Sequence, residues 1–289
     1  MRIGVTLPQT EIGSDPSVLR DYAQAAEDLG YDHILAYEHI LGAQPGDHRP
    51  GWSGTYDYQT TFHEPFVLFA YLGAITTKIE FVTGILVLPQ RQAPLVAKQA
   101  AEVDILTGGR LRLGVGNGWN DAEYEGLGEN FHNRGRRIEE QIEVMRHLWT
   151  EDVVTFEGKW HNLNHLALAP RPGRSIPVWF GGMSEAVMKR AARIGDGWYP
   201  QFRPGGPDPR ETIERFHSYV REFGRDPADL GLQSTAGFAN ATPDQWTQRL
   251  EEFAAAGITH VCVNTMGAGL ASPRDHIEAI RRYKAETGV

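Results

Sequence analysis

The segment 177–199, PVWFGGMSEAVMKRAARIGDGWY, contains one complete repeat of the pattern that decides the fold. A short apolar strand at 178–180 runs into a glycine turn, and Ser184 is placed to cap the helix that follows. A second strand, 197–199, comes after that helix. A strand, a helix and a strand in this order predict two parallel strands joined by a crossover helix.

The same alternation runs along the whole chain without a composition break that would mark a linker. Several apolar runs are hydrophobic on both faces, which fits strands of a buried parallel sheet. Eight strands with eight following helices predict a single-domain (β/α)8 TIM barrel over residues 1–289, although a doubly wound sheet with an added edge strand gives a similar cadence. The predicted strands are 2–7, 33–36, 79–87, 111–115, 178–180, 197–199, 230–235 and 258–263.

Two stretches interrupt the alternation. The first is a long loop at 37–63, rich in Gly, His, Trp and Tyr, and the second is a hairpin insertion at about 152–174. Long irregular loops in a compact domain tend to be functional. The helices, by contrast, start clearly, because a capping side chain precedes a proline. These starts are Asp15-Pro16, Asp208-Pro209, Thr242-Pro243 and Ser272-Pro273.

The composition limits the class of protein. With 289 residues, 41% of them hydrophobic, the chain is globular and not disordered. A formal net charge of -9 argues against a nucleic-acid partner. The single cysteine, Cys262, lies in an apolar run, so we expect neither a disulfide framework nor a metal site. We find no signal peptide and no run of 18 apolar residues, and therefore expect a cytoplasmic protein with no membrane partner.

In a barrel of this kind, functional residues follow the carboxyl ends of the strands. Glu38 and His39 come after the second strand, and a carboxylate beside an imidazole suits proton transfer near neutral pH. An anchoring pair in a loop is an equal alternative. Gly84 interrupts the third strand, which indicates a bulge or the close approach of a ligand, or a plain irregularity at a barrel corner.

Two further glycine turns follow strands. The run GNGW at 116–119 is not a dinucleotide fingerprint, because tryptophan stands where the last glycine belongs. A flexible backbone beside an aromatic ring suits a flat ligand, whereas a packed tryptophan in a tight loop is the alternative. The run GGMS at 181–184 opens a helix, and the free amides at a helix start favour a phosphate or another anion.

As a set, these motifs resemble the bacterial luciferase-like superfamily, and more narrowly its deazaflavin (coenzyme F420)-dependent oxidoreductase branch. The resemblance covers about residues 1–200, with the motifs in the family's order, and continues more weakly through the last two βα units. The motifs are Met1-Arg2-Ile3-Gly4-Val5, Glu38-His39, Thr83-Gly84-Ile85, the run GGRLRLGVGNGW at 108–119, Gly181-Gly182-Met183-Ser184 and Gly195-Asp196-Gly197-Trp198.

The resemblance implies hydride transfer between F420 and a small organic substrate, with the cofactor across the mouth of the barrel. It also implies a non-prolyl cis peptide at Gly84-Ile85, forming a bulge behind the cofactor ring. His39, with Glu38, is expected near the reacting face as a proton donor or hydrogen-bond partner. The residues expected to hold the cofactor are Gly84, Ile85, Val87, Asn117, Gly118, Trp119, Gly181, Gly182, Met183 and Ser184.

The loop at 37–63 suggests an aromatic lid over an apolar or aromatic substrate. Its candidate substrate-binding residues are Trp52, Tyr56, Phe62 and His63. We find no clear set of basic residues that would clamp a sugar phosphate. The polyglutamate tail of F420 would need a local positive groove, for which the candidates are Arg91, Arg134, Arg136 and Arg137.

Two alternative functions remain open. An FMN-dependent monooxygenase, using oxygen and a separate flavin reductase, would use the same phosphate turn. A barrel that binds a flavin-like ligand without catalysis is the second. The family analogy also implies a homodimer packed through the helices of the early βα units.

Overall fold

The computed structural model describes residues 1–46, 51–52, 54–203 and 205–289. Parallel strands close into a barrel in the order β3-β2-β1-β11-β10-β9-β8-β5, and β5 pairs back with β3. The predicted (β/α)8 barrel is therefore confirmed. The barrel strands are β1 (Arg2–Thr6), β2 (His33–Ala36), β3 (Glu80–Thr83), β4 (Leu86–Val87), β5 (Leu111–Gly116), β8 (Val178–Gly181), β9 (Gly197–Tyr199), β10 (Gly231–Gly237) and β11 (His260–Asn264).

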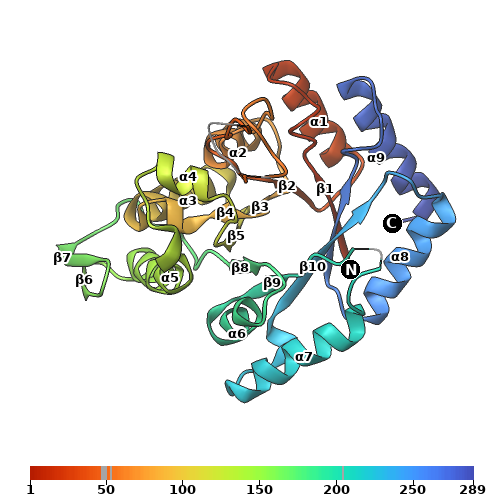
Figure 1. Cartoon of the computed structure of the whole chain (residues 1–289). Helices are drawn as coiled ribbons and strands as arrows, with labels where there is room; N and C mark the ends of the chain where they lie inside the picture. Colours follow the sequence, from red (N-terminus) through yellow and green to blue (C-terminus); the bar gives the residue numbers. More distant parts are fainter. Residues whose placement is uncertain (47–50, 53, 204) are drawn as a thin grey trace.

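The helices form an outer layer around these strands (Figure 1). The four predicted proline starts are confirmed at α1, α7, α8 and α9, and Thr242 and Gln245 form a complete capping box. The α-helices are α1 (Pro16–Asp28), α2 (Pro65–Ala74), α3 (Ala93–Thr107), α4 (Asp121–Gly126), α5 (Arg134–Thr150), α6 (Glu185–Ile194), α7 (Pro209–Glu222), α8 (Pro243–Ala255) and α9 (Pro273–Thr287).

The third strand differs from its prediction as one run over 79–87. It ends at Thr83, and β4 resumes at Leu86 after a cis peptide between Gly84 and Ile85, as the resemblance implied. A Cβ atom on Gly84 would lie 2.4 Å from a methyl group of Leu35. The backbone thus approaches its neighbour more closely than any residue with a side chain allows, and the β-branched pattern around it does not reveal this.

The barrel interior is filled by side chains and is not a pore. Leu35, Val82, Tyr199 and Cys262 form one buried cluster inside it. Burial raises the pKa of the Cys262 thiol to about 12, so this side chain packs as a neutral group. Within the described part of the chain, no helix has the length and hydropathy needed to cross a bilayer.

The hairpin expected at about 152–174 is present and consists of β6 (Val154–Glu157) and β7 (Asn162–Leu166), which pair antiparallel. It projects from the barrel beside α5 (Figure 1). Glu140 of α5 anchors its turn by accepting hydrogen bonds from the amides of Lys159, Trp160 and His161 at 2.7–2.8 Å. The insertion therefore lies on the outside of the barrel, in the connection from α5 to the amino end of β8.

Candidate active site

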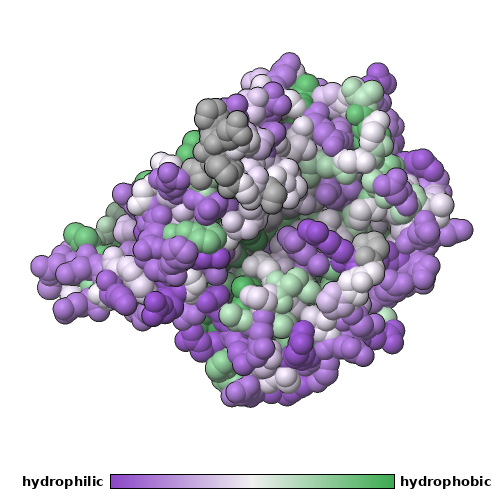
Figure 2. Space-filling model, viewed as in Figure 1, coloured by the Kyte–Doolittle hydropathy of each residue, from purple (hydrophilic) through white to green (hydrophobic). Residues whose placement is uncertain are grey.

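The carboxyl ends of the parallel strands meet at the mouth of the barrel, together with the loops that follow them. Figure 2 shows a hollow near the middle of the molecular face seen in Figure 1, with pale and hydrophobic side chains inside a mostly hydrophilic surround. The sequence motifs after β2, β4, β5 and β8 all lead to this end of the barrel.

Ile85 connects three of the predicted cofactor motifs. A Cβ on Gly116 would lie 2.8 Å from Cδ1 of Ile85, and a Cβ on Gly181 would lie 2.5 Å from its Cγ2. The isoleucine side chain therefore lies against the bare backbone at the ends of β5 and β8. Since no other residue type leaves this room, the glycines are required for the packing.

Val87 and Asn117 extend this packed surface. Gly118 has a φ of +65°, and a Cβ there would meet Cγ1 of Val87 at 2.6 Å. The backbone carbonyl of Asn117 accepts a hydrogen bond from the Tyr124 hydroxyl at 2.6 Å. The side-chain Oδ1 of Asn117 is buried without a partner among the described residues, so a bound polar group would satisfy it.

The turn 181–184 leads directly into α6. Gly182 has a φ of +126°, and its carbonyl accepts a hydrogen bond from Nε1 of Trp198 at 2.7 Å. The sulfur of Met183 lies 3.2 Å from the amide of Gln201. Ser184 caps the helix, as predicted. The first amides of α6 have no intrahelical partner, which makes this end of the helix suitable for an anion.

His39 has a carboxylate partner that the sequence did not reveal. Its Nδ1 lies 2.9 Å from Oε2 of Glu123, a residue of α4. The other oxygen of Glu123 accepts hydrogen bonds from the amides of Ile40 at 2.7 Å and Leu41 at 3.2 Å. Burial favours the neutral acid, but the hydrogen bonds from His39 and from these amides prevail and lower the pKa of Glu123.

Glu38 is not the partner of His39, which corrects the expectation that the two adjacent residues act together. Its buried carboxylate accepts hydrogen bonds from the amide of Val87 at 2.5 Å and from Nε of Arg91 at 2.7 Å. Burial raises the pKa of Glu38, although Arg91 acts in the opposite direction. Glu38 therefore anchors β4 through the amide of Val87. Glu38 and His39 have different partners because the side chains of adjacent residues in an extended chain point to opposite sides.

Aromatic rings surround His39. The ring centres of Phe62, Tyr56 and Trp119 lie 4.9, 5.1 and 5.5 Å from that of His39. Trp52 adds to this group, since its ring lies 6.4 Å from that of Trp119. We call His39, Trp52, Tyr56, Phe62 and Trp119 the aromatic cluster.

The cluster gathers three of the four predicted lid residues. His63 lies apart from it, because its Nε2 is 3.1 Å from the carbonyl of Gly13 in the loop after β1. Trp52 is tied to the loop after β5, since its indole nitrogen donates a hydrogen bond to Oδ1 of Asn120 at 3.3 Å. Residues 47–50 and 53 of the predicted loop lie outside the described residues.

The arginines considered for a positive groove are largely engaged. Arg91 pairs with both Glu38 and Glu64, and Arg137 pairs with Glu129. Arg134 packs 3.5 Å above the ring of Phe131, and Arg136 is exposed. Two of the four positive charges are thus balanced by neighbouring carboxylates.

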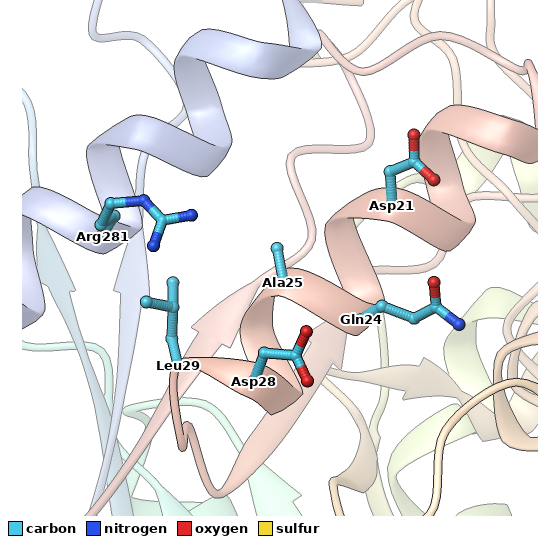
Figure 3. A pocket seen from close by; sticks show the side chains of 6 residues that line it. All are labelled: Asp21, Gln24, Ala25, Asp28, Leu29 and Arg281. Atoms are coloured by element: carbon cyan, nitrogen blue, oxygen red, sulfur yellow. The ribbon is translucent and has the colours of Figure 1, made fainter.

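A separate groove lies in the outer helical layer, between α1 and α9 (Figure 3). No strand end and no predicted site residue contributes to it, and two carboxylates face it. It therefore does not compete with the barrel mouth as a cofactor site. The groove is lined by Asp21, Gln24, Ala25, Asp28, Leu29 and Arg281.

The closed barrel defines a TIM-barrel protein, and the candidate site lies at the carboxyl end of its strands, where proteins of this fold carry their active sites. Residues 1–289 match the model of the luciferase-like monooxygenase family, and the chain belongs to that family. It is a luciferase-like oxidoreductase.

Three relatives illustrate its place in the family. The chain is 36% identical over 249 residues to the uncharacterized protein Rv0940c of Mycobacterium tuberculosis, covering 83% of this chain and 82% of that one. It is 32% identical over 191 residues to an F420-dependent glucose-6-phosphate dehydrogenase of Intrasporangium calvum, covering 63% and 53%. It is also 32% identical over 184 residues to an FMNH2-dependent dimethylsulfone monooxygenase of Pseudomonas fluorescens, covering 62% and 46%.

Solved structures share the fold. An F420-dependent secondary alcohol dehydrogenase in complex with an F420-acetone adduct superposes with a TM-score of 0.79 at 19% identity, covering 99% of this chain and 98% of that chain. The monooxygenase RslO1 of Streptomyces bottropensis superposes with a TM-score of 0.81 at 18% identity, with the same coverage. The relatives thus include enzymes named for F420 and enzymes named for FMNH2.

Proposed function

We propose that the protein is an F420-dependent oxidoreductase that transfers a hydride between the deazaflavin and a small apolar or aromatic substrate. The observation that carries this proposal is the packing of Ile85 against Gly116 and Gly181, within the same barrel mouth as His39. This arrangement supports a flat ring lying over the bulge. The resemblance to the F420 branch and the F420-dependent relatives add support.

The residues at the mouth fit such a cofactor. The amides at the start of α6, with Gly182 and Ser184, would hold its phosphate, and the orphaned Oδ1 of Asn117 would accept a hydrogen bond from its polar chain. Ile85 and Val87 would support the ring. When bound, the deazaflavin supplies or accepts the hydride at one ring carbon.

The protein's own contribution is to hold the substrate and to move a proton. The Glu123 carboxylate forms a hydrogen bond with Nδ1 of His39. The other ring nitrogen, Nε2, has no hydrogen-bond partner in the described part of the chain. Nε2 is therefore the atom that would donate or accept the proton. The aromatic cluster would exclude water and offer apolar surface to the substrate.

One observation favours FMN as the second candidate cofactor. Arg91 and Arg137 are paired with carboxylates, so only Arg134 and Arg136 of the four candidate arginines lack a carboxylate partner among the described residues and could attract a polyglutamate tail. FMN has no such tail, and the same helix start would hold its phosphate. An FMN-dependent monooxygenase, like the one from Pseudomonas fluorescens, would then use oxygen.

Titration of the purified protein with F420 and, separately, with FMN tests the choice. We expect F420 to bind more tightly by at least tenfold, measured by quenching of its fluorescence. Tighter binding of FMN would move the protein to the monooxygenase alternative. The proposal also predicts that His39→Ala loses F420-linked turnover by about 10²-fold while F420 binding remains, and unchanged turnover would remove His39 from the mechanism.

We further propose that the protein is a homodimer packed through the early helices. Large apolar side chains are exposed on α2 at Val67, with 69% of its surface accessible, and on α3 at Leu95 and Leu106. Exposed apolar surface of this kind favours association with a second copy. Leu106→Glu is expected to yield monomers in light scattering, whereas a dimer that persists would place the interface elsewhere.

A further inference from the structure

The pair His39 and Glu123 joins two segments that are distant in sequence. His39 lies near the start of the loop after β2, and Glu123 lies on the short helix after β5. Their side chains are 12% and 1% exposed, so the contact at 2.9 Å is shielded from solvent. A charge-assisted hydrogen bond in such a place is short and directional.

The chemistry of the carboxylate fixes the position of the imidazole proton. An ionised carboxylate only accepts hydrogen bonds, so Nδ1 of His39 must donate its hydrogen to Glu123. The amides of Ile40 and Leu41 also point to this carboxylate and stabilise its ionised form. In the neutral imidazole, Nε2 then carries the lone pair, and it receives the proton when the ring becomes cationic.

We propose that Glu123 is the positioning residue of His39 and that it holds the Nδ1–H tautomer with Nε2 presented to the substrate. The inference rests on the proposed function, in which Nε2 exchanges a proton with the substrate. Glu123 acts through the histidine and not on the substrate itself. The same carboxylate fixes the start of the lid loop, because two of its partners are backbone amides of that loop.

Among the described residues, two ionisable groups lie beside His39. Glu123 comes from α4 and the phenol of Tyr56 from the loop, whereas the neighbouring rings of Phe62 and Trp119 do not titrate. Glu38 is engaged by Arg91 and the amide of Val87. Within the described part of the chain, Glu123 is therefore the carboxylate in contact with His39 and the counter-charge of its cationic imidazole.

The variant Glu123→Gln separates charge from shape. Its amide oxygen can still accept from the loop amides, but its NH2 group would donate to Nδ1 of His39. The imidazole would then hold its proton on Nε2, and the cation would lose its counter-charge. Asp121→Asn is the matched control, because Asp121 is an exposed carboxylate on the first turn of the same helix.

The first test reads the tautomer without any cofactor. The ring nitrogens of 15N-histidine-labelled protein are recorded by NMR, and His39 is assigned by its absence in His39→Gln. We expect Nδ1–H in the neutral ring of the wild type and of Asp121→Asn, and Nε2–H in Glu123→Gln. A wild-type ring that carries its proton on Nε2 would overturn the proposal, even if Glu123→Gln did not fold.

The second test reads catalysis with F420. Glu123→Gln is expected to lower kcat by about 10²-fold, with the Kd for F420 within twofold, and to move the acid limb of the pH–rate profile to lower pH. In a His39→Gln background the same change is expected to lower kcat by less than twofold further. Equal kcat in Glu123→Gln and Asp121→Asn, an unmoved profile or additive losses would contradict the proposal. If F420 supports no turnover in the wild type, the proposed function fails, and the NMR result still decides the role of Glu123.

Discussion

The two sides of the barrel mouth are built by different means. On the side of β4, β5 and β8, glycines let Ile85 and Val87 pack directly against main chain. On the side of the loop after β2, contacts are made by side chains, in the aromatic cluster and at Glu123. We call these the glycine side and the aromatic side.

The difference assigns a role to each side. A surface made of backbone and two aliphatic residues has a fixed shape and suits a flat group that is common to many enzymes. Rings carried on a loop change with the loop sequence, so they suit recognition of a particular substrate. We therefore assign the cofactor to the glycine side and the substrate to the aromatic side, as part of the proposed function.

The largest expected effect is a loss of stability when a glycine of the glycine side is replaced by alanine, which adds a methyl group. A Cβ on Gly114 would lie 2.0 Å from the backbone carbonyl oxygen of Thr83, which cannot move independently of β3. Gly114→Ala should lower the free energy of unfolding by about 3–5 kcal/mol in urea titrations. Gly237→Ala is the control, because a Cβ there would meet no atom of a non-neighbouring residue within 4 Å. Equal stability of the two variants would show that the close approach is not required.

A smaller effect is expected where the clash involves a flexible side chain. A Cβ on Gly116 would meet Cδ1 of Ile85 at 2.8 Å and push it from its place. Gly116→Ala should weaken F420 binding by about tenfold, which corresponds to about 1.4 kcal/mol. A second change, Ile85→Val, removes Cδ1 and should restore most of the affinity in the same fluorescence titration. Wild-type affinity in the single variant would remove Ile85 from the cofactor site.

Substitutions on the aromatic side should weaken the binding of the substrate and leave the binding of F420 unchanged. Phe62→Ala removes the ring nearest to His39 and should raise the KM of an F420-linked substrate by about fivefold, with the Kd for F420 within twofold. Tyr58→Ala is the control, since Tyr58 lies on the same loop and is 56% exposed. A change in F420 affinity with an unchanged KM would reverse the assignment of the two sides.

The smallest expected effect is a difference between the two sides in their response to acid. We expect the aromatic side to lose hydrogen-exchange protection at a higher pH than the glycine side. The pKa of Glu123 is lowered in the folded protein, so its stabilising contribution is fully present above the ordinary glutamate pKa of about 4.3 and is lost as the pH falls through the lowered value. The side-chain contacts of Ile85 with Gly116 and Gly181 involve no titratable group. Hydrogen exchange, corrected for its intrinsic pH dependence, should increase first in 37–46 and 120–126. Earlier loss of protection at 111–116 would contradict this order.

The glycine side was largely predictable from the sequence because its signals are local. Gly84, Gly116 and Gly181 each interrupt or end an apolar run, and their neighbours are fixed by the strand order of the barrel. Gly84 indicated a bulge, but the predicted strand still ran on to 87, because the β-branched pattern continues beyond the break. A turn of only two residues is too short to interrupt the pattern of apolar residues that predicts a strand.

The aromatic side was predictable only in composition. The sequence predicted Trp52, Tyr56 and Phe62 as part of an aromatic lid, but adjacency wrongly suggested Glu38 as the partner of His39. Glu123 lies 84 positions away, and such a contact depends on how two loops meet in space. Its one local signal is its place on the first turns after the run at 116–119, at a strand end where functional residues gather.

The most direct test of this account is hydrogen exchange with and without saturating F420. We predict that the coenzyme protects the backbone at 84–88, 116–119 and 182–187, which form the glycine side and the start of α6. Protection confined to other surfaces, such as the groove between α1 and α9 in Figure 3, would contradict the assignment of the cofactor to the barrel mouth.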